Sequence, residues 1–132
     1  MPHPIASTYT SFIVDEINRV LEHDDLGNFD LRNIRDNGVI DGACRRIVNG
    51  QPGAAVSGRV LEVEPNPVGF LVEIKQDRGN FDMVYRGTAV FDSAGRVNSI
   101  AGRRSKVMHV GETRDADAAL AQDEGTWVAT QP

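Results

Sequence analysis

The alternation of apolar and polar residues over residues 80–110 constrains the fold of this chain more than any other feature. One face of the predicted strand carries Phe81, Met83, Tyr85, Gly87, Ala89 and Phe91, and the other face carries Asp82, Arg86 and Thr88. The sequence Asp92-Ser93-Ala94-Gly95 supplies a local side-chain acceptor and a glycine able to adopt positive φ, which is typical of a tight turn. The segment therefore predicts a β-hairpin whose return strand begins at Arg96.

Two more strands are predicted upstream of this hairpin, over residues 56–63 and 70–75. The proline-rich residues 65–69 must turn the chain between them, and residues 76–80 make the next reversal. Connections this short favour an antiparallel meander, because a parallel pair of strands needs a crossover of about a dozen residues or more.

The N-terminal third has a helical pattern instead. Spacings of three and four residues predict an amphipathic helix of about four turns from Tyr9, Phe12, Ile13, Ile17, Val20 and Leu21. Two short helical pieces are expected after it, the first capped by Asp30 and the second running from Asp41 to Val48. A last short helix is expected over residues 114–122, followed by the single tryptophan, Trp127.

These elements predict one α+β domain, with the N-terminal amphipathic helix and the short helices packed on a four-stranded antiparallel meander. Its parts are a helical region over about residues 7–49, the meander over about 54–110 and a tail with a short helix over about 113–132. This order is similar in layout to the cystatin-like α+β rolls, which implies a sheet that wraps the first helix. Such rolls serve enzymes, carriers and assembly modules, so the layout does not select a function.

Composition sets broad limits on the function. The 132 residues carry a formal net charge of −5, which disfavours general nucleic-acid binding, since phosphate backbones attract basic surfaces. The one cysteine, Cys44, excludes an internal disulfide, and no apolar run reaches the 18 or so residues needed to cross a bilayer. Residues 1–10 lack the basic start and apolar stretch of a secretion signal, so a cytoplasmic protein is expected.

Standard catalytic and metal-binding motifs are missing from the sequence. There is no glycine-rich phosphate loop, no zinc-ligand spacing and no Gly-x-Ser-x-Gly elbow, so we expect no cofactor and no metal. The acidic group His23-Asp24-Asp25 near Asp30 is interpreted as the solvated end of a helix. Cys44 is interpreted as a small buried hydrophobe, although Arg45 and Arg46 beside it favour a thiolate.

Two groups of residues are candidate sites. His109 could act as an acid or base in a pocket if it faces inward near Tyr85 and Asp82. A basic strip carries Arg96, Arg103, Arg104 and Lys106, with Arg86 on the neighbouring strand. A solvated sheet face is the first interpretation of the strip, and an anionic ligand or an acidic partner protein is the second. RNA is disfavoured, because no aromatic residues are interleaved with these cations.

Three classes of function follow, in order of preference. The first is a non-catalytic interaction or assembly module that forms homo-oligomers through its sheet, because apolar residues lie opposite the expected core face and Trp127 stands alone in the tail. The candidate interface residues are Leu61, Val63, Val84, Val90 and Trp127. The second is a small-molecule binder or an enzyme with a pocket between helix and sheet, built around His109, Tyr85 and Asp82. The third is binding of an anion or a nucleic acid by the arginine strip.

Overall fold

A computed structural model gives the fold and describes residues 3–15, 17, 19–62, 69–94, 96–108 and 121–131. Within these residues every regular element is a β-strand. The strands are β1 (Thr8–Val14), β2 (Val20–Asp30), β3 (Val39–Ile40), β4 (Arg45–Val48), β5 (Gln51–Glu62), β6 (Gly69–Asp77), β7 (Phe81–Phe91), β8 (Val97–Met108) and β9 (Ala121–Thr130).

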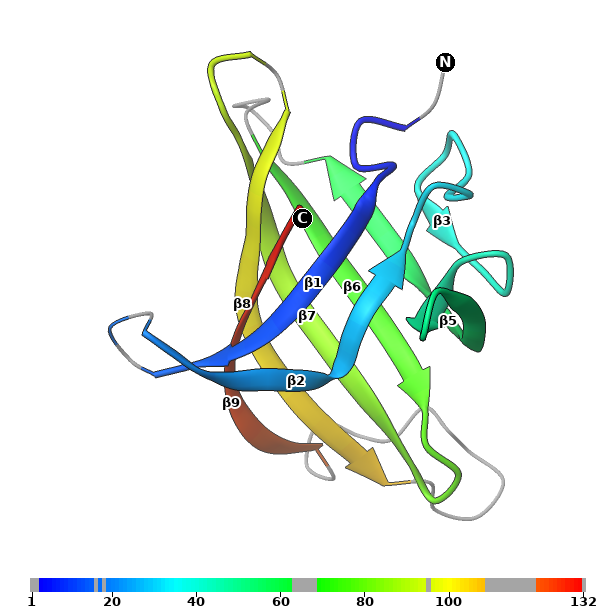
Figure 1. Cartoon of the computed structure of the whole chain (residues 1–132), viewed down its shortest axis with the longest axis vertical. Helices are drawn as coiled ribbons and strands as arrows, with labels where there is room; N and C mark the ends of the chain where they lie inside the picture. The colour runs from blue at the N-terminus through cyan, green and yellow to red at the C-terminus, as the bar shows by residue number, and fades with distance from the viewer. Residues whose placement is uncertain are drawn as a thin grey trace.

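The strands form one sheet that closes into an eight-stranded antiparallel barrel. Each strand of the barrel pairs with its neighbours in sequence, and the ring closes because the first strand, β1, pairs with the last, β9. The short β3 is the exception, since it adds to the edge of β5 and lies outside the ring order. Figure 1 shows the long strands β6, β7 and β8 crossing the view behind β1 and β2. Closure gives each barrel strand a partner strand on both sides, although β2 pairs with β4 only over Asn28–Asp30.

The α+β prediction, including the cystatin-like roll, is therefore wrong. The expected N-terminal helix is a β-hairpin formed by β1 and β2. Its turn is made by Asp15, whose side-chain Oδ1 accepts hydrogen bonds from the amides of Ile17 and Arg19 at 3.0 and 2.8 Å. β1 is rich in β-branched and aromatic residues and pairs with a strand on both sides, so sheet pairing overrides the helical spacing.

The two short helices expected between Asp30 and Val48 are also wrong, although the capping chemistry is present. Asp30 and Asp41 each accept a hydrogen bond from the amide two residues ahead, at 2.8 and 3.0 Å. The same side-chain bond that starts a helix also closes an isolated turn, and here the chain continues as irregular segments and as β4. For the predicted tail helix, residues 114–120 lie outside the described residues, and residues 121 and 122 begin β9.

The strands predicted between residues 56 and 108 are present in the structure. The hairpin of β7 and β8 pairs Phe91 with Val97, with a register shift between Val90 and Phe91. The strands predicted over residues 56–63 and 70–75 correspond to β5 and β6. Their antiparallel pairing is also as expected. The meander of the prediction is thus half of the barrel.

The barrel interior is filled by large side chains from all sides of the ring. The largest fully buried ones are Trp127, Tyr9, Tyr85 and Phe29. Tyr85 meets Trp127 edge to face at 5.3 Å, and Tyr9 stacks on Phe29 at 5.4 Å. The N-terminal residues 3–7 lead into β1 with Ile5 buried, and the Tyr9 hydroxyl donates to the Ile5 carbonyl oxygen at 2.5 Å. Cys44 belongs to the same core.

Close approach between neighbouring strands depends on glycine at two places. Gly87 and Gly102 lie opposite one another on β7 and β8, and a Cβ on Gly102 would come within 1.9 Å of the Arg86 carbonyl oxygen. Gly58 on β5 has φ of 140°, and a Cβ there would come within 1.9 Å of the Glu73 carbonyl oxygen. These positions allow the sheet to coil tightly enough to close with few strands.

Among the described residues no helix has the length and apolar character required to cross a membrane.

Candidate functional site

One end of the barrel contains a small cavity with a basic lining. We call this the cationic cavity; its volume is about 180 Å³, and its lining residues are Arg78, Phe81, Met83, Arg104, Lys106 and Glu124. Its lining residues lie where β6 passes into β7 and where β8 ends and β9 begins. These strand ends are at the bottom of Figure 1. Inward-facing residues of β7 and β8 supply most of the wall, because alternate side chains of a barrel strand point inside.

The deepest charged group beside this cavity is an ion pair between two distant strands. Arg104 of β8 donates from Nη1 to Oδ1 of Asp24 on β2 at 2.5 Å, and the two side chains are 13% and 0% exposed. Ser11 donates from Oγ to the other carboxylate oxygen of Asp24 at 3.0 Å. Arg104 also donates from Nε to the carbonyl oxygen of Glu124 at 3.1 Å. Asp24 thus has partners for both oxygens, as a buried carboxylate requires.

Tyr85 brings a second buried polar group to the same region. Its hydroxyl faces Asp24, but no hydrogen bond of ordinary geometry joins it to any described residue. Burial, and after it the negative charge of Asp24, raises the pKa of this hydroxyl above its ordinary value. The group therefore stays protonated at neutral pH and keeps a proton to donate.

Lys106 supplies a cation that pairs with no acidic side chain among the described residues. Its ammonium lies 4.4 Å from the centre of the Phe81 ring, a cation–π contact. In the part of the chain that the structure describes, no carboxylate forms an ion pair with it. Arg78, which also lines the cavity, donates from Nε to Oε1 of the buried Gln76 at 2.8 Å. The cavity lining thus carries three cationic side chains and one carboxylate, Glu124.

The structure separates the residues of the predicted basic strip. Arg104 and Lys106 line the cationic cavity, whereas Arg103 lies on the outer face of β8 and forms an ion pair with Asp123. That guanidinium holds the pKa of Asp123 below its ordinary range. Arg96 is exposed beside the β7–β8 turn, where its Nε lies 3.6 Å from Oδ2 of Asp92. The strip is therefore not one surface, because neighbouring residues of a strand face opposite sides of the barrel wall.

The two described members of the predicted acid–base group, Tyr85 and Asp82, face different sides of the barrel wall. Tyr85 is inside the barrel, but Asp82 belongs to the alternate, outward-facing set of β7. His109 lies outside the described residues. Within the described part of the chain, no group of three histidine, cysteine, aspartate or glutamate residues could hold a metal ion.

The candidate interface residues also occupy different environments. Val90 is on the outer face and exposed, whereas Val84 is buried although it belongs to the outward-facing set. Trp127 is fully buried inside the barrel, where its Nε1 donates to the carbonyl oxygen of Arg86 at 3.4 Å. Leu61 is exposed, and Val63 lies outside the described residues. Trp127 therefore offers no surface to a partner.

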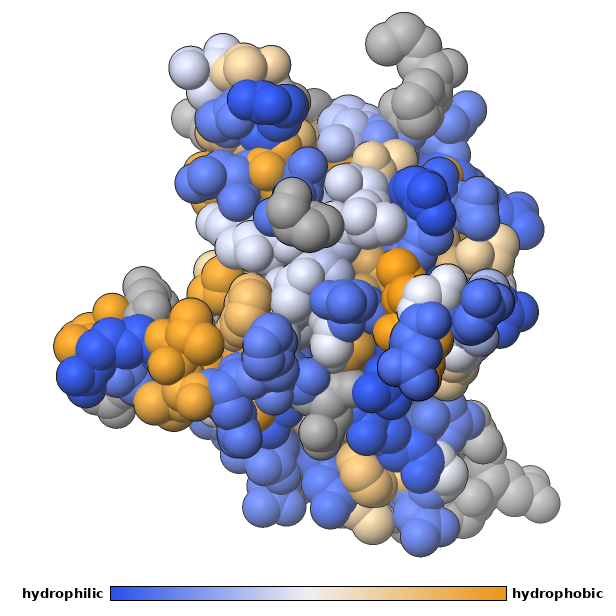
Figure 2. All heavy atoms as spheres, in the orientation of Figure 1, coloured by the Kyte–Doolittle hydropathy of each residue, from blue (hydrophilic) through white to orange (hydrophobic). Residues whose placement is uncertain are grey.

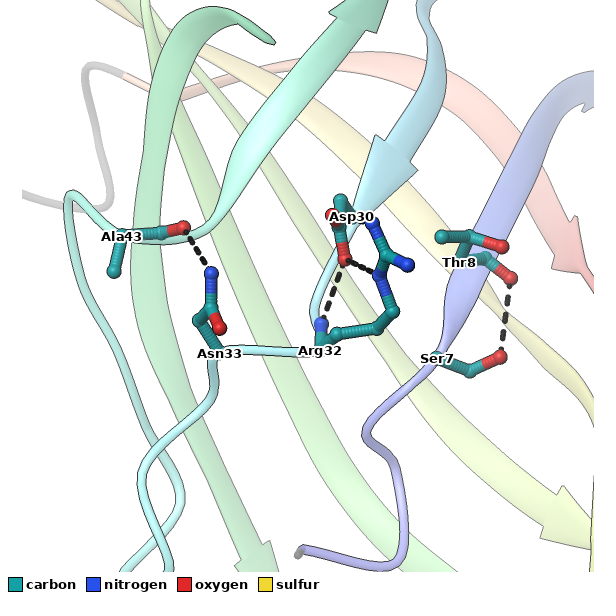
Figure 3. Close-up of polar contacts among 6 residues, drawn as sticks. All are labelled: Ser7, Thr8, Asp30, Arg32, Asn33 and Ala43. Carbon is teal, nitrogen blue, oxygen red and sulfur yellow. Dashed lines mark hydrogen bonds and ion pairs between the residues drawn. The ribbon is translucent and has the colours of Figure 1, made fainter. Parts of the chain in front are cut away.

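A second hollow, of about 260 Å³, lies on the outside near β2 and β4. Figure 3 shows how its polar groups are used: Asp30 accepts hydrogen bonds from the backbone and side chain of Arg32, and Asn33 donates to the Ala43 carbonyl oxygen at 3.2 Å. The Arg32 guanidinium holds the pKa of Asp30 below its ordinary range. These contacts stabilise the segment between β2 and β4, so we regard this hollow as structural.

Sequence reasoning missed the contribution of Asp24 to the interior. The sequence predicts that Asp24 belongs to a solvated acidic stretch, but Asp24 is buried and pairs with Arg104. The available signal was on β8, where Arg104 and Lys106 share the face of the buried Ile100. Charged residues on a core-facing set predict either a buried partner or a polar cavity.

Comparison of the chain with protein families, with curated proteins and with solved structures finds no match. The function is therefore argued from the geometry of the barrel.

Proposed function

We propose that the protein binds a small anion, a carboxylate or phosphate group on a short organic body, in the cationic cavity. The observation that carries the proposal is Lys106, a half-buried ammonium on the cavity wall without an acidic partner among the described residues. A cation in that position interacts favourably with an incoming anion, and Arg104 beside it adds donors on the same wall.

The volume of the cationic cavity and the apolar residues in its lining indicate a small ligand with a short carbon skeleton. A volume of about 180 Å³ is below the roughly 300 Å³ at which pockets for drug-sized molecules begin, so the ligand is small. Phe81 and Met83 provide an apolar wall for a few carbon atoms. A compact aromatic or aliphatic acid fits this combination of charge and apolar surface better than a bare ion does.

Binding without catalysis is the function that these contacts favour. Ser11 and Asp24 form a hydroxyl–carboxylate pair among the described residues, but both side chains are buried and Arg104 forms an ion pair with the carboxylate. A nucleophile and its base must reach the substrate, and this pair lies beneath the cavity wall. Asp24 and Ser11 therefore position Arg104 for the ligand.

The test is titration of the protein with benzoate, acetate and inorganic phosphate. Binding is measured by calorimetry and by the fluorescence of Trp127. Trp127 is the only tryptophan in the chain and contacts Tyr85, so its emission is sensitive to changes beside the cavity. We expect saturable binding of benzoate that weakens with added salt, and no binding of neutral benzyl alcohol. A lack of saturable binding for all three anions would contradict the proposal.

The matched variants are Lys106→Gln inside the barrel and Lys75→Gln on the outer face of β6. Loss of a hydrogen bond to a charged group, worth about 1.5–3 kcal/mol, predicts at least a tenfold weaker affinity for Lys106→Gln. Lys75 lies 3.7 Å from Glu73 outside the barrel, so its replacement should leave binding unchanged. Equal affinities of the two variants would place the anion elsewhere. Circular dichroism should confirm that both variants keep the strand signal.

A further inference from the structure

The β1–β2 hairpin ends in an exposed apolar tip. We call this the arm tip; it consists of Ile17, Val20 and Leu21, which are 70%, 60% and 63% exposed. Figure 1 shows the hairpin turn extending from the barrel at the left, and Figure 2 shows hydrophobic surface gathered on the same projection. Exposed aliphatic residues are common singly, but a cluster on a projection is typical of a contact site.

Hydrogen bonds and an ion pair of Asp15 stabilise the turn that carries the arm tip. Asp15 accepts two backbone hydrogen bonds there, its own amide donates to the Arg19 carbonyl oxygen at 3.0 Å, and its carboxylate pairs with Arg19 at 2.8 Å. The turn therefore holds the three apolar side chains away from the barrel, where they contribute nothing to the core.

The opposite wall of the barrel carries an apolar groove on its outer face. This outer groove, of about 500 Å³, spans β5 to β8, with Leu61, Leu71, Thr88 and Ala101 among its lining residues. Leu61 and Leu71 are cross-strand partners and are 48% and 51% exposed. The backbone of the paired Gly87 and Gly102 forms part of its floor.

The two surfaces carry opposite charge. Arg59, Arg86 and Arg103 border the outer groove. Arg86 pairs with Glu73 at 2.7 Å and Arg103 pairs with Asp123, so Arg59 supplies the net positive charge of the groove among the described residues. Around the arm tip, the charges of Asp15 and Arg19 cancel because the two side chains form an ion pair. Among the described residues of the arm tip and its turn, the exposed Glu22 therefore supplies the net negative charge. Among the described residues neither Glu22 nor Arg59 forms an ion pair.

We propose that the arm tip of one copy docks in the outer groove of a second copy, with Glu22 of the first beside Arg59 of the second. The arm tip and the outer groove belong to different parts of the same barrel, since β4 lies between β2 and β5 and β9 lies between β1 and β8. The contact is therefore heterologous and repeats from copy to copy, which produces a ring or an open chain. A hairpin tip buries less than the roughly 800 Å² per partner of a standard interface, so each contact is weak.

Sedimentation velocity over a range of micromolar to millimolar concentrations tests this directly. We expect the average mass of the wild type to rise with concentration beyond that of a dimer. Leu21→Lys in the arm tip and Leu71→Lys in the outer groove should each be monomeric, since each places a charge at a desolvated contact. Val48→Lys, at an exposed aliphatic residue outside both surfaces, should associate like the wild type.

Mixing the two monomeric variants distinguishes this contact from a symmetric one. The Leu71→Lys chain keeps an intact arm tip and the Leu21→Lys chain keeps an intact groove, so an equimolar mixture should form a heterodimer and nothing larger. A face-to-face dimer would not be restored by mixing. Either a wild type that stays monomeric over the whole range or a mixture that stays monomeric would overturn the proposal.

Charge reversal provides an independent check of the polar contact. Glu22→Arg and Arg59→Glu should each shift self-association to higher concentration, and the double variant should restore it because the two charges are exchanged. Double variants that associate no better than the single ones would exclude the Glu22–Arg59 contact and overturn this orientation of the arm.

Discussion

Arg104 and Asp24 are 80 residues apart in the sequence and form an ion pair at 2.5 Å inside the barrel. Their strands, β8 and β2, are not neighbours in the sheet, since β9 and β1 lie between them. The pair therefore connects two parts of the wall through the interior. It also fixes the guanidinium beside the cationic cavity, so the same contact serves stability and the proposed binding site.

Removing one member of this pair should destabilise the protein strongly. In Arg104→Gln, the carboxylate of Asp24 remains buried without its cation, which predicts a loss of about 3–5 kcal/mol in the free energy of unfolding. The double variant Asp24→Asn/Arg104→Gln should recover much of this loss, because no buried charge remains. Urea denaturation measures all three proteins.

The neighbouring residue is the natural control for that experiment. Arg103 pairs with Asp123 on the outer face, where both side chains are more than half exposed, so Arg103→Gln should have a much smaller effect. Similar losses for Arg103→Gln and Arg104→Gln would contradict the assignment of the two arginines to opposite sides of the wall.

The two tyrosines should make the protein sensitive to alkali. Burial raises the pKa of Tyr9, and burial followed by Asp24 raises that of Tyr85, whereas tyrosine in an unfolded chain ionises near pH 10. The folded state therefore retains protons that the unfolded state loses. This contribution to stability is complete below about pH 10 and decreases as the pH rises above it.

Ultraviolet absorbance of tyrosinate, recorded together with Trp127 fluorescence, tests the alkaline prediction. Because Tyr9 and Tyr85 are the only tyrosines, no tyrosinate signal should appear until the fluorescence reports unfolding. A tyrosine that ionises near pH 10 in the native protein would disprove it. Tyr85→Phe should weaken the pH dependence and leave stability at neutral pH equal or higher, since it removes a buried hydroxyl without a hydrogen bond.

Gly102→Ala should damage the barrel wall. The added Cβ would lie 1.9 Å from the Arg86 carbonyl oxygen and 2.5 Å from the Gly87 Cα, and both are backbone atoms that cannot rotate away. We expect a loss of about 1–3 kcal/mol or more, measured by thermal and urea unfolding. Gly42→Ala is the control, because nothing lies within 4 Å of its Cβ position. Equal stability of the two variants would show that β7 and β8 are further apart.

The strands that the sequence predicted are those with local alternation and a local turn. Over β7 and β8 the apolar residues recur with period two, and the Asp92 side chain accepts from the amides of Ala94 and Arg96 at 2.9 and 3.0 Å to close the hairpin. Both signals lie within about 30 residues of one another, so no distant contact is needed to recognise them.

The N-terminal third shows the opposite case. Tyr9, Ile13 and Leu21 fit a helical stripe, but β1 pairs with β2 and β9, and β9 lies more than 100 residues downstream. The pairing that decides the structure is thus non-local, and no pattern within residues 7–22 reveals it. Three apolar residues of the predicted helical stripe, Ile17, Val20 and Leu21, are exposed at the arm tip instead of being buried in a core.

By itself the sequence determined the hairpin, the antiparallel meander and the placement of Arg103 and Arg104 on opposite faces of one strand, because each depends on alternation along a single segment. Only the tertiary structure decided the closed barrel, the burial of Asp24 and the division of the basic strip between the interior and the outer face. The physical reason is that closure pairs the first strand with the last, and this brings a carboxylate from β2 within hydrogen-bonding distance of an arginine from β8.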